Sequence, residues 1–241
     1  MKKRRLKKKA ILAALILALS LTGIIYSIIK IFSWKKDTNT NNDIKEKINE
    51  NVKINEETNE YIVDFDKLKE QNEDTIAYLQ IENTNIEYVV VKTTNNNYYL
   101  RHNFNKEYNV AGWIFADYRN KFDGTDKNLI IYGHNMKDGS MFSNLKNLIN
   151  KKWKNEEHII TLKTRELETK YQIFSTYTIE PEEYYIQTVF NDTNYEQFLN
   201  TIKSRSTYNY DVQLDTSDKI LTLSTCNDNG NKRIVVHAKQ I

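Results

Sequence analysis

One cysteine, one histidine and one arginine in this sequence each stand at the end of an apolar, strand-like run. Cys226, the only cysteine among 241 residues, closes the run Lys219–Thr225, and Arg233 follows seven residues later. His134 lies about ninety residues upstream, behind the apolar run Asn128–Tyr132. Together a thiol, an imidazole and a guanidinium can carry acyl transfer through a thioester. The thiolate is the nucleophile, the imidazole moves protons and the guanidinium stabilises negative charge.

The surroundings of Cys226 favour a reactive thiol. A polar turn at residues 227–231 follows it, so the next strand should return antiparallel and bring Arg233 close to Cys226. Reactive cysteines occupy partly exposed, electropositive places, and a strand end beside a loop is such a place. The alternatives are that Cys226 is a small buried hydrophobic residue and that Arg233 is a solvated surface charge.

Four histidines compete for the acid–base role. We expect it at His134, because a glycine before it permits a close approach and because it stands at a strand end. His237 is the main rival, since it shares a strand face with Arg233 but lies about 13 Å further along. His102 lies in a loop-like segment, and His158 begins a strand-like run.

The N-terminal segment is typical of a membrane anchor. The first 36 residues carry ten Lys and Arg and no acidic residue. The uncharged run from Ala10 to Ile29 would span about 30 Å as a helix, the thickness of a hydrocarbon core. Lys30 and Trp34 close it like interfacial residues. We expect an uncleaved signal-anchor with its N-terminus in the cytoplasm. A cleaved signal peptide, with a small-x-small site at Ala18–Ser20, is the alternative.

The sequence predicts four parts. They are a cytoplasmic basic stub (1–9), a transmembrane signal-anchor (10–32), a stalk (33–60) and an extracellular catalytic domain (61–241). The stalk is rich in Asn, Lys and Glu, as expected of a solvated tether. It is also compatible with a weak helix, because Ile44, Ile48 and Val52 recur every four residues.

Charge and cysteine content exclude several classes of partner. Beyond residue 36 the chain carries 25 basic against 32 acidic side chains, so it would repel the phosphates of a nucleic acid. A single cysteine forms neither an internal disulfide nor a cysteine-based zinc site. No acidic cluster suited to calcium is visible, and we expect neither a metal nor a cofactor.

The pattern after residue 60 is that of a mainly β domain. Runs rich in β-branched and aromatic residues predict strands at 76–81, 86–91, 113–116, 128–132, 158–163, 170–177, 184–189, 219–225 and 232–239. Helices are predicted at Asp64–Gln71, Ser140–Lys152 and Asn194–Ser204. Many short strands and few helices favour a closed or sandwiched β architecture.

Three ordered motifs resemble the sortases. The segment Thr222–Cys226, followed by Arg233–Lys239, resembles the C-terminal signature of that family. The segment Tyr132–Met136, continuing through Asp138–Phe142, is similar to the histidine segment of class B sortases in particular. Further similarity is found in Tyr98–Leu100, Gly112–Asn120 and Tyr185–Thr188, and it extends over residues 61–241. A helix before the cysteine strand separates class B from the other sortases.

The resemblance implies an eight-stranded sortase-type β-barrel with a few peripheral helices, tethered to the membrane of a Gram-positive bacterium. Such a cysteine transpeptidase would cut a C-terminal sorting signal of the type Asn/Ser-Pro-x-Thr-Asn/Gly after Thr. It would hold the acyl group on Cys226 and pass it to an amine of the peptidoglycan cross-bridge or its lipid-linked precursor. His134 would be the acid and base, and Arg233 the oxyanion or substrate-orienting group.

The resemblance also implies a set of substrate-binding residues. These would be Asn96, Leu100, Tyr185, Ile186, Ser224 and Thr225, although Asn97 matches the asparagine position as well as Asn96 does. Some relatives carry an acidic residue just after the cysteine. Here Asp228 follows two residues later, and a turn-capping role suits it better than an orienting one.

Three other interpretations compete with this one. An L,D-transpeptidase also uses Cys, His and Arg, but it places Arg two residues after Cys and has a glycine-rich stretch before it. Here no glycine precedes Cys226 closely, and Arg233 is seven positions away. A papain-like hydrolase would have the cysteine before the histidine. The non-catalytic alternative is a membrane-tethered binding module in which Cys226 is buried and inert.

Overall fold

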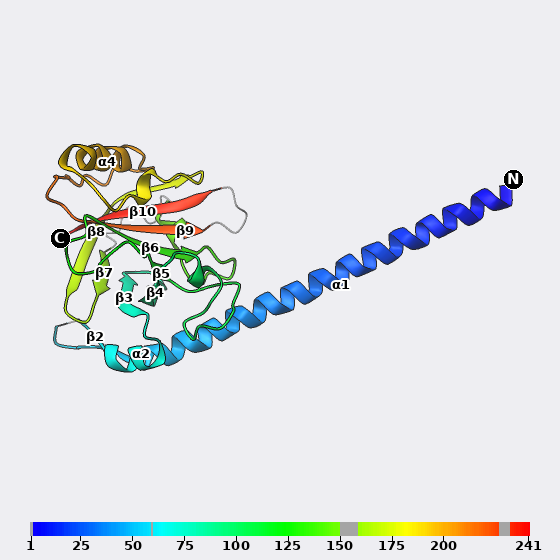
Figure 1. Ribbon diagram of the computed structural model, residues 1–241, viewed down its shortest axis with the longest axis horizontal. Coiled ribbons are helices and arrows are strands. Elements are labelled where there is room, and N and C mark those ends of the chain that lie inside the picture. Colours follow the sequence, from blue (N-terminus) through cyan, green and yellow to red (C-terminus); the bar gives the residue numbers. More distant parts are fainter. Residues whose placement is uncertain (1, 59, 150–158, 227–231) are drawn as a thin grey trace. The chain divides into compact units, whose positions relative to one another are not determined.

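The structure is a computed structural model that describes residues 2–58, 60–149, 159–226 and 232–241 (Figure 1). The chain divides into two compact units, Met1–Thr40 and Asn41–Ile241. The predicted turn at 227–231 with Asp228, the last residues of the helix predicted at Ser140–Lys152, and His158 lie outside the described residues.

Helix α1 (Lys2–Asn49) contains the apolar run. Its residues 9–49 include a stretch long and apolar enough to cross a membrane, with a mean hydropathy of 2.4 and none of that stretch buried. A signal sequence near an N-terminus has the same properties. The anchor, its orientation and the four predicted parts therefore stay predictions.

The end of α1 belongs to the second compact unit, which begins at Asn41. Ile44 and Ile48 are buried there, and the Lys45 ammonium donates to the Asn85 carbonyl at 2.9 Å. The four-residue recurrence of Ile44 and Ile48 thus marks the packed stripe of a helix. Part of the segment predicted as a stalk is folded against the domain that follows it.

Eight strands in the described part of the chain close into a barrel, which confirms the predicted fold. Around the barrel they follow the order β10-β8-β7-β3-β4-β5-β6-β9. They are β3 (Thr75–Ile81), β4 (Glu87–Val91), β5 (Phe115–Ala116), β6 (Asn128–His134), β7 (Ile159–Lys163), β8 (Glu168–Ile179), β9 (Ile220–Cys226) and β10 (Arg233–Gln240). Closure leaves no unpaired edge strand. A separate hairpin pairs β1 (Val52–Ile54) with β2 (Tyr61–Val63).

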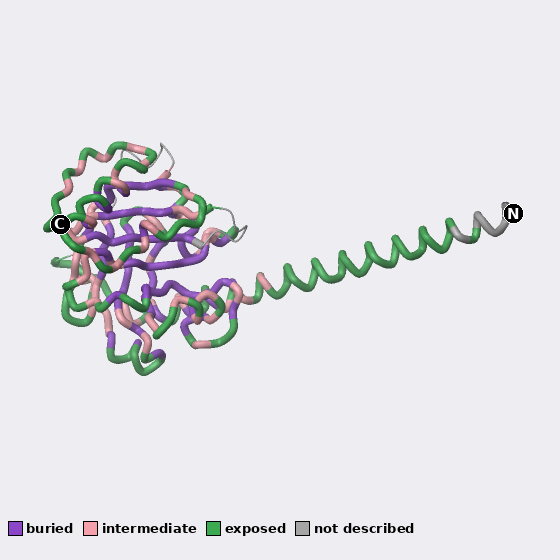
Figure 2. The backbone as a smooth tube through the Cα atoms, turned by 45° about the horizontal axis from the view of Figure 1, so that its top comes forward, coloured by how far each residue is buried: buried purple, intermediate pink, exposed green. Residues whose placement is uncertain are grey.

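Apolar strand residues make the core, and the buried segments in Figure 2 follow the barrel strands. Helix α4 (Asp192–Ser204) covers one side of this barrel. Its predicted stripe of Tyr195, Phe198, Leu199 and Ile202 packs against Phe174, Tyr177, Ile220 and Val235 of β8, β9 and β10. Asn191 caps the helix, since its side chain accepts from the Asn194 N–H at 2.9 Å.

Helix α2 (Phe65–Gln71) also matches its prediction, because the Asp64 carboxylate accepts from the Lys67 N–H at 3.1 Å and caps it. The helix predicted at Ser140–Lys152 is shorter in the described residues, where α3 covers only Leu145–Leu148. Met141 has a φ of 54° and bridges Asn135, so a tight turn occupies the first part of the predicted helix. Such a φ is incompatible with a right-handed helix.

The strand predicted at residues 184–189 is wrong. The segment contains a 3₁₀ helix, η2 (Tyr184–Ile186), and a second such turn is η1 (Tyr98–Leu100). Tyr185 is fully buried in the cluster beneath α4. The aromatic residues of this segment pack into the core and do not pair with a neighbouring strand. Both a buried packing residue and a strand residue are often aromatic, so composition alone does not distinguish them.

Candidate active site

Strands β6 and β9 lie side by side and parallel, and their register joins two of the predicted catalytic residues. Tyr132 is the Cα partner of Ser224, and His134 is the Cα partner of Cys226. Neighbouring strands are about 4.8 Å apart. The histidine and the cysteine, about ninety residues apart in sequence, therefore end adjacent strands at the same rim of the barrel.

Arg233 begins β10, which pairs antiparallel with β9 as predicted. The paired residues of β10 and β9 begin with Val235 opposite Ser224, and continuing this register by two residues would set Arg233 opposite Cys226. The Thr225 hydroxyl accepts from the Ile234 N–H at 3.0 Å, which ties the two strands together near this position. His134, Cys226 and Arg233 thus occupy one rim, while their catalytic roles stay predictions.

His134 is a buried residue, 6% exposed, and a main-chain carbonyl orients its ring. Its Nε2 lies 2.9 Å from the oxygen of Leu100. A carbonyl only accepts, so Nε2 carries the hydrogen, and in the neutral ring the lone pair belongs to Nδ1. The His134 carbonyl accepts from the Phe142 N–H at 2.9 Å, which fixes the strand end. Nδ1 is then the atom suited to take up and release a proton.

The carbonyl that orients His134 is held by a close backbone contact. Leu100 ends η1, and the Trp113 N–H donates to Tyr99 O at 3.0 Å. Gly112 before it has a φ of +57°, and a Cβ there would lie 2.3 Å from Tyr99 O and 2.9 Å from Leu100 O. Asn41, at the end of α1, donates to Gly112 O at 3.0 Å. Only glycine allows this approach.

We expect Gly112→Ala to reduce both stability and activity. The methyl group would force the Tyr99 and Leu100 carbonyls away and so misplace the His134 ring. The left-handed φ alone costs about 1–3 kcal/mol for a non-glycine residue. Urea unfolding and peptide cleavage would measure the two effects.

Gly124→Ala is the matched control for this change. Gly124 also has a positive φ, +83°, but nothing lies within 4 Å of its missing Cβ. It should lose stability while keeping turnover per folded molecule. Equal specific activity of the two folded variants would show that the turn does not position His134.

His237, the predicted rival, is built into the core. The Thr222 hydroxyl donates to Asn128 Oδ1 at 2.6 Å, so it accepts from His237 Nδ1–H at 2.8 Å. His237 Nε2 then accepts from the Tyr177 hydroxyl at 2.8 Å. The ring is fully buried, and desolvation lowers the pKa of His237 to about 3. A neutral ring with both nitrogens engaged is poorly suited to proton transfer with a substrate.

This depressed pKa predicts acid sensitivity. Between pH 6.5 and about 3 the unfolded chain protonates His237 while the folded chain does not. The free energy of unfolding therefore falls as the pH drops through this window, by an amount on the order of 3–5 kcal/mol. Above pH 6.5 the ring is neutral in both states and contributes no slope.

A His237→Gln variant isolates this effect, because the carboxylates contribute to wild type and variant alike. Urea midpoints measured from pH 7.5 to 3.5 should fall less steeply for the variant. Parallel curves would mean that His237 is not a neutral buried group.

The structure places the predicted substrate-binding side chains in internal contacts. Ser224 and Tyr185 are fully buried, and their hydroxyls lie 3.2 Å apart. Asn96 donates to Asp117 Oδ2 at 2.9 Å and accepts from the Tyr118 N–H at 3.0 Å. Ile186 is half-buried, and its carbonyl accepts from Arg119 at 2.8 Å. Leu100 acts on His134 through its carbonyl. Their roles toward a substrate stay predictions.

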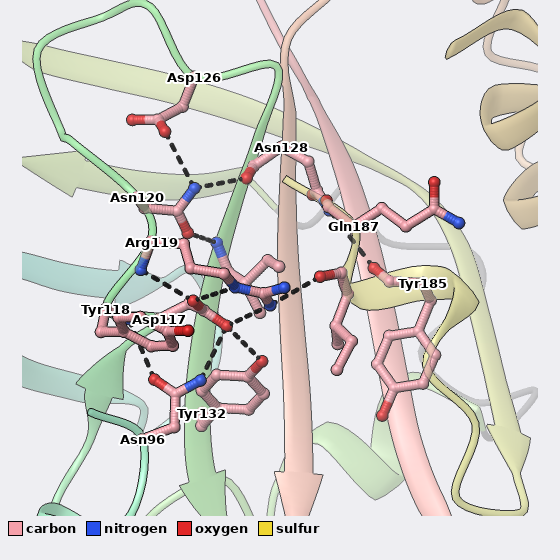
Figure 3. Close-up of polar contacts among 12 residues, drawn as sticks. Asn96, Asp117, Tyr118, Arg119, Asn120, Asp126, Asn128, Tyr132, Tyr185 and Gln187 are labelled. Atoms are coloured by element: carbon pink, nitrogen blue, oxygen red, sulfur yellow. Dashed lines mark hydrogen bonds and ion pairs between the residues drawn. The ribbon is translucent and has the colours of Figure 1, made fainter. Parts of the chain in front are cut away.

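Two residues without a predicted role join these side chains. Asp117 and Arg119 form an ion pair of 2.7 Å that also binds Asn96 (Figure 3). In addition, Arg119 donates to the Ile186 carbonyl. The sequence signals are their place in the segment Gly112–Asn120, which resembles the sortases, and an acidic residue directly after the apolar run 113–116 with an arginine two positions on.

A cavity among the described residues lies elsewhere. Its lining includes Ile220 at the start of β9, Gln240 at the end of β10 and Tyr171 early in β8. Because β9 and β10 are antiparallel, these residues share the barrel end opposite Cys226. The shared register of His134 and Cys226 is a better guide to the reactive site than this cavity.

Comparison with known proteins agrees with this arrangement. The Sortase domain family matches residues 79–241, more than half of the chain. The crystal structure of Clostridium perfringens sortase B has 38% sequence identity and a TM-score of 0.69, and the alignment covers 73% of this chain and 99% of that one. The chain belongs to the class B sortases. The Sortase domain match removes the support for the L,D-transpeptidase interpretation.

Two further relatives support the class. The curated sortase B of Listeria monocytogenes is 38% identical to this sortase over 146 residues, which are 59% of each protein. The chain thus matches about three fifths of the length of that relative. A structure of the Staphylococcus aureus sortase B–substrate complex has 35% identity and a TM-score of 0.69, covering 73% of this chain and 84% of that one.

Proposed function

We propose that this sortase is a membrane-anchored cysteine transpeptidase that attaches surface proteins to the cell wall. Cys226 would be the nucleophile, His134 the acid and base, and Arg233 the stabiliser of the oxyanion. The observation that supports it most is the register of β6 and β9, in which His134 and Cys226 are Cα partners. The register of β10, continued by two residues, would bring Arg233 to the same rim and supports its proposed role.

The proposed reaction has two halves. First the Cys226 sulfur bonds to the carbonyl carbon of the substrate Thr, the peptide C–N bond breaks, and the thiol proton reaches the leaving amine through His134. Next an acceptor amine bonds to the same carbon, the C–S bond breaks, and the amine's proton returns to sulfur. A guanidinium near the carbonyl oxygen stabilises the tetrahedral intermediate of each half.

The substrate would be a secreted protein with a C-terminal signal of the type Asn/Ser-Pro-x-Thr-Asn/Gly. The S. aureus relative has been solved as a substrate complex, which supports a peptide-binding site in this chain. Asn96, Leu100, Tyr185, Ile186, Ser224 and Thr225 would line it. The acceptor would be an amine of the peptidoglycan cross-bridge or its lipid-linked precursor.

The proposed location is the outer face of the cytoplasmic membrane of a Gram-positive bacterium. Residues 1–9 would stay in the cytoplasm, residues 10–32 would span the membrane, and the part after the stalk (33–60), from residue 61, would be outside. The apolar stretch in α1 and the basic residues before it support this orientation.

A peptide panel tests the proposed function. The full-length protein in detergent would be mixed with pentapeptides of the form Asn/Ser-Pro-x-Thr-Asn/Gly, with and without a peptide that has a free N-terminal amine. We expect cleavage after Thr and, with the amine present, a product joined through Thr to that amine. If no member of the panel is cut, the binding-module interpretation gains, and products that never join the amine would indicate a plain hydrolase.

A further inference from the structure

The Asp117 carboxylate is a fully buried hub directly after β5. Its Oδ2 accepts from the Tyr132 hydroxyl at 2.9 Å, the Asn96 amide at 2.9 Å and Arg119 Nη2 at 2.7 Å. Its Oδ1 accepts from Arg119 Nε at 2.8 Å and from the Arg119 N–H at 3.0 Å. Figure 3 shows these groups converging on one side chain.

Asp117 and Arg119 keep their charges across the physiological pH range. Burial would raise the pKa of Asp117, but hydrogen bonds from Arg119, Tyr132 and Asn96 outweigh it and lower that pKa below its usual value. The bonds to Asp117 raise the pKa of Arg119 above its usual value. Burial, followed by the charge of Asp117, raises the pKa of Tyr132. Asp117 is therefore a carboxylate across the physiological range, in a two-pronged pair with Arg119.

The pair connects three segments that are distant in sequence. Asn96 belongs to the loop before η1, Tyr132 lies two residues before His134 on β6, and the Ile186 carbonyl in η2 accepts from Arg119 Nη2 at 2.8 Å. Asn128 at the start of β6 adds a second tie to this region, donating to the Gln187 carbonyl at 2.9 Å. Two of the joined residues, Asn96 and Ile186, are predicted to bind substrate.

We propose that Asp117 and Arg119 are a positioning pair that sets the spacing of the substrate-binding segments around Asn96 and Ile186. The pair acts through these segments, and Asp117 itself is fully buried. The inference rests on the proposed function in one respect, namely that the ligand bound by these segments is the sorting peptide. The link from Asp117 through Arg119 to η2 is a feature of the fold and is testable without turnover.

Asp117→Asn separates the two halves of the hub. Oδ2 receives three donors from Tyr132, Asn96 and Arg119, whereas Oδ1 receives two, both from Arg119. The asparagine side chain keeps three hydrogen bonds if its oxygen takes the Oδ2 position, and only two if its oxygen takes the Oδ1 position. In the favoured orientation its NH₂ group faces two Arg119 donors and cannot accept from them. The variant therefore weakens the hold on Arg119. Arg119→Ala removes the same link from its other end, at a side chain that is 35% exposed.

The matched control is the pair Asp66–Arg165. Its ion-pair distance is also 2.7 Å, but both side chains are largely exposed. Neither residue belongs to η1, η2 or β6. Asp66→Asn and Arg165→Ala should leave every measured quantity within about twofold of wild type, since exposed ion pairs contribute little.

Kinetics of the full-length protein supply the first measurement. For Asp117→Asn and Arg119→Ala we expect KM for the sorting peptide to rise about tenfold, the effect of losing one charge-assisted hydrogen bond. kcat should stay within about threefold, and alkylation of Cys226 by iodoacetamide within about twofold, because the β6–β9 register is untouched. The double variant should be no worse than Arg119→Ala, since both changes cut one link.

Amide hydrogen exchange supplies the second measurement. Peptides covering 93–101 and 183–190 should exchange faster in both variants, while those covering β6 and β9 should not change. Variants whose KM and exchange match those of the control pair would overturn the proposal. So would a loss of kcat and alkylation rate in parallel with KM, which would place the pair at the reactive thiol or in global stability.

The two hypotheses fail separately in these experiments. A wild-type protein that cleaves no peptide contradicts the proposed function, and hydrogen exchange alone then decides the positioning pair. Faster exchange confined to 93–101 and 183–190 would still support it, and unchanged exchange would overturn it. Cleavage with unchanged exchange in Arg119→Ala contradicts the pair and leaves the proposed function intact.

Discussion

Replacing Cys226 with alanine is expected to abolish peptide cleavage, with a loss of about 10⁴-fold or more. No other residue supplies a thiol, because the chain has a single cysteine. The change removes one heavy atom, so the urea midpoint should be close to that of wild type. Cleavage of the sorting peptide and urea unfolding, measured on the same preparation, separate loss of chemistry from loss of fold. Turnover above about one per cent of wild type would assign the nucleophile elsewhere.

Replacing His134 with alanine is expected to reduce kcat by about 10²–10⁴-fold, the usual contribution of a positioned acid–base group. The ring lies in the register position beside Cys226, and the Leu100 carbonyl fixes its tautomer. Alkylation of Cys226 should survive in this variant, because a small reagent needs no proton donor for a leaving amine. Steady-state cleavage with and without an acceptor amine would measure the effect in both halves of the reaction.

His237→Gln is the matched histidine control. It should retain kcat at pH 7.5 and a temperature at which it is folded, because His237 is engaged by Thr222 and Tyr177 within the core. The opposite pattern, an active His134→Ala and an inactive but folded His237→Gln, would transfer the acid–base role to His237.

The sequence pattern predicts most of the strands, and the resemblance to the sortases implies their closure into a barrel. Apolar runs over residues 128–132 and 219–225 predict strands that stop just before His134 and Cys226, and the structure extends these strands to include both residues. The antiparallel return toward Arg233 followed from the polar residues between the two runs. Strands and the turns between them are determined mainly by residues close together in sequence, and they therefore leave a pattern of hydrophobic periodicity.

Other features depend on contacts that leave no such pattern. Leu100 orients His134 through a main-chain carbonyl, which every residue possesses. The hub at Asp117 is built by donors from three distant segments, and a lone acidic residue in sequence looks like any solvated one. The segment around Tyr185 has strand-like composition because a buried aromatic anchor and a strand select the same residues.

The end of α1 is a further example. Its Asn- and Lys-rich composition predicts a solvated tether, yet Ile44 and Ile48 are buried and Asn41 bonds Gly112 beside the turn that holds His134. Two isoleucines four residues apart are a weak signal when polar residues surround them. Tertiary packing decides such a helix.

The central claim, acyl transfer through a thioester on Cys226, is tested most directly by intact-protein mass spectrometry. The full-length protein would be mixed with a cleaved sorting peptide without any amine and quenched in acid. We expect a mass increase equal to the peptide fragment ending in Thr, absent in Cys226→Ala. Added amine should remove it as the joined product appears. An unmodified mass throughout turnover, or an adduct that persists in Cys226→Ala, would contradict the account.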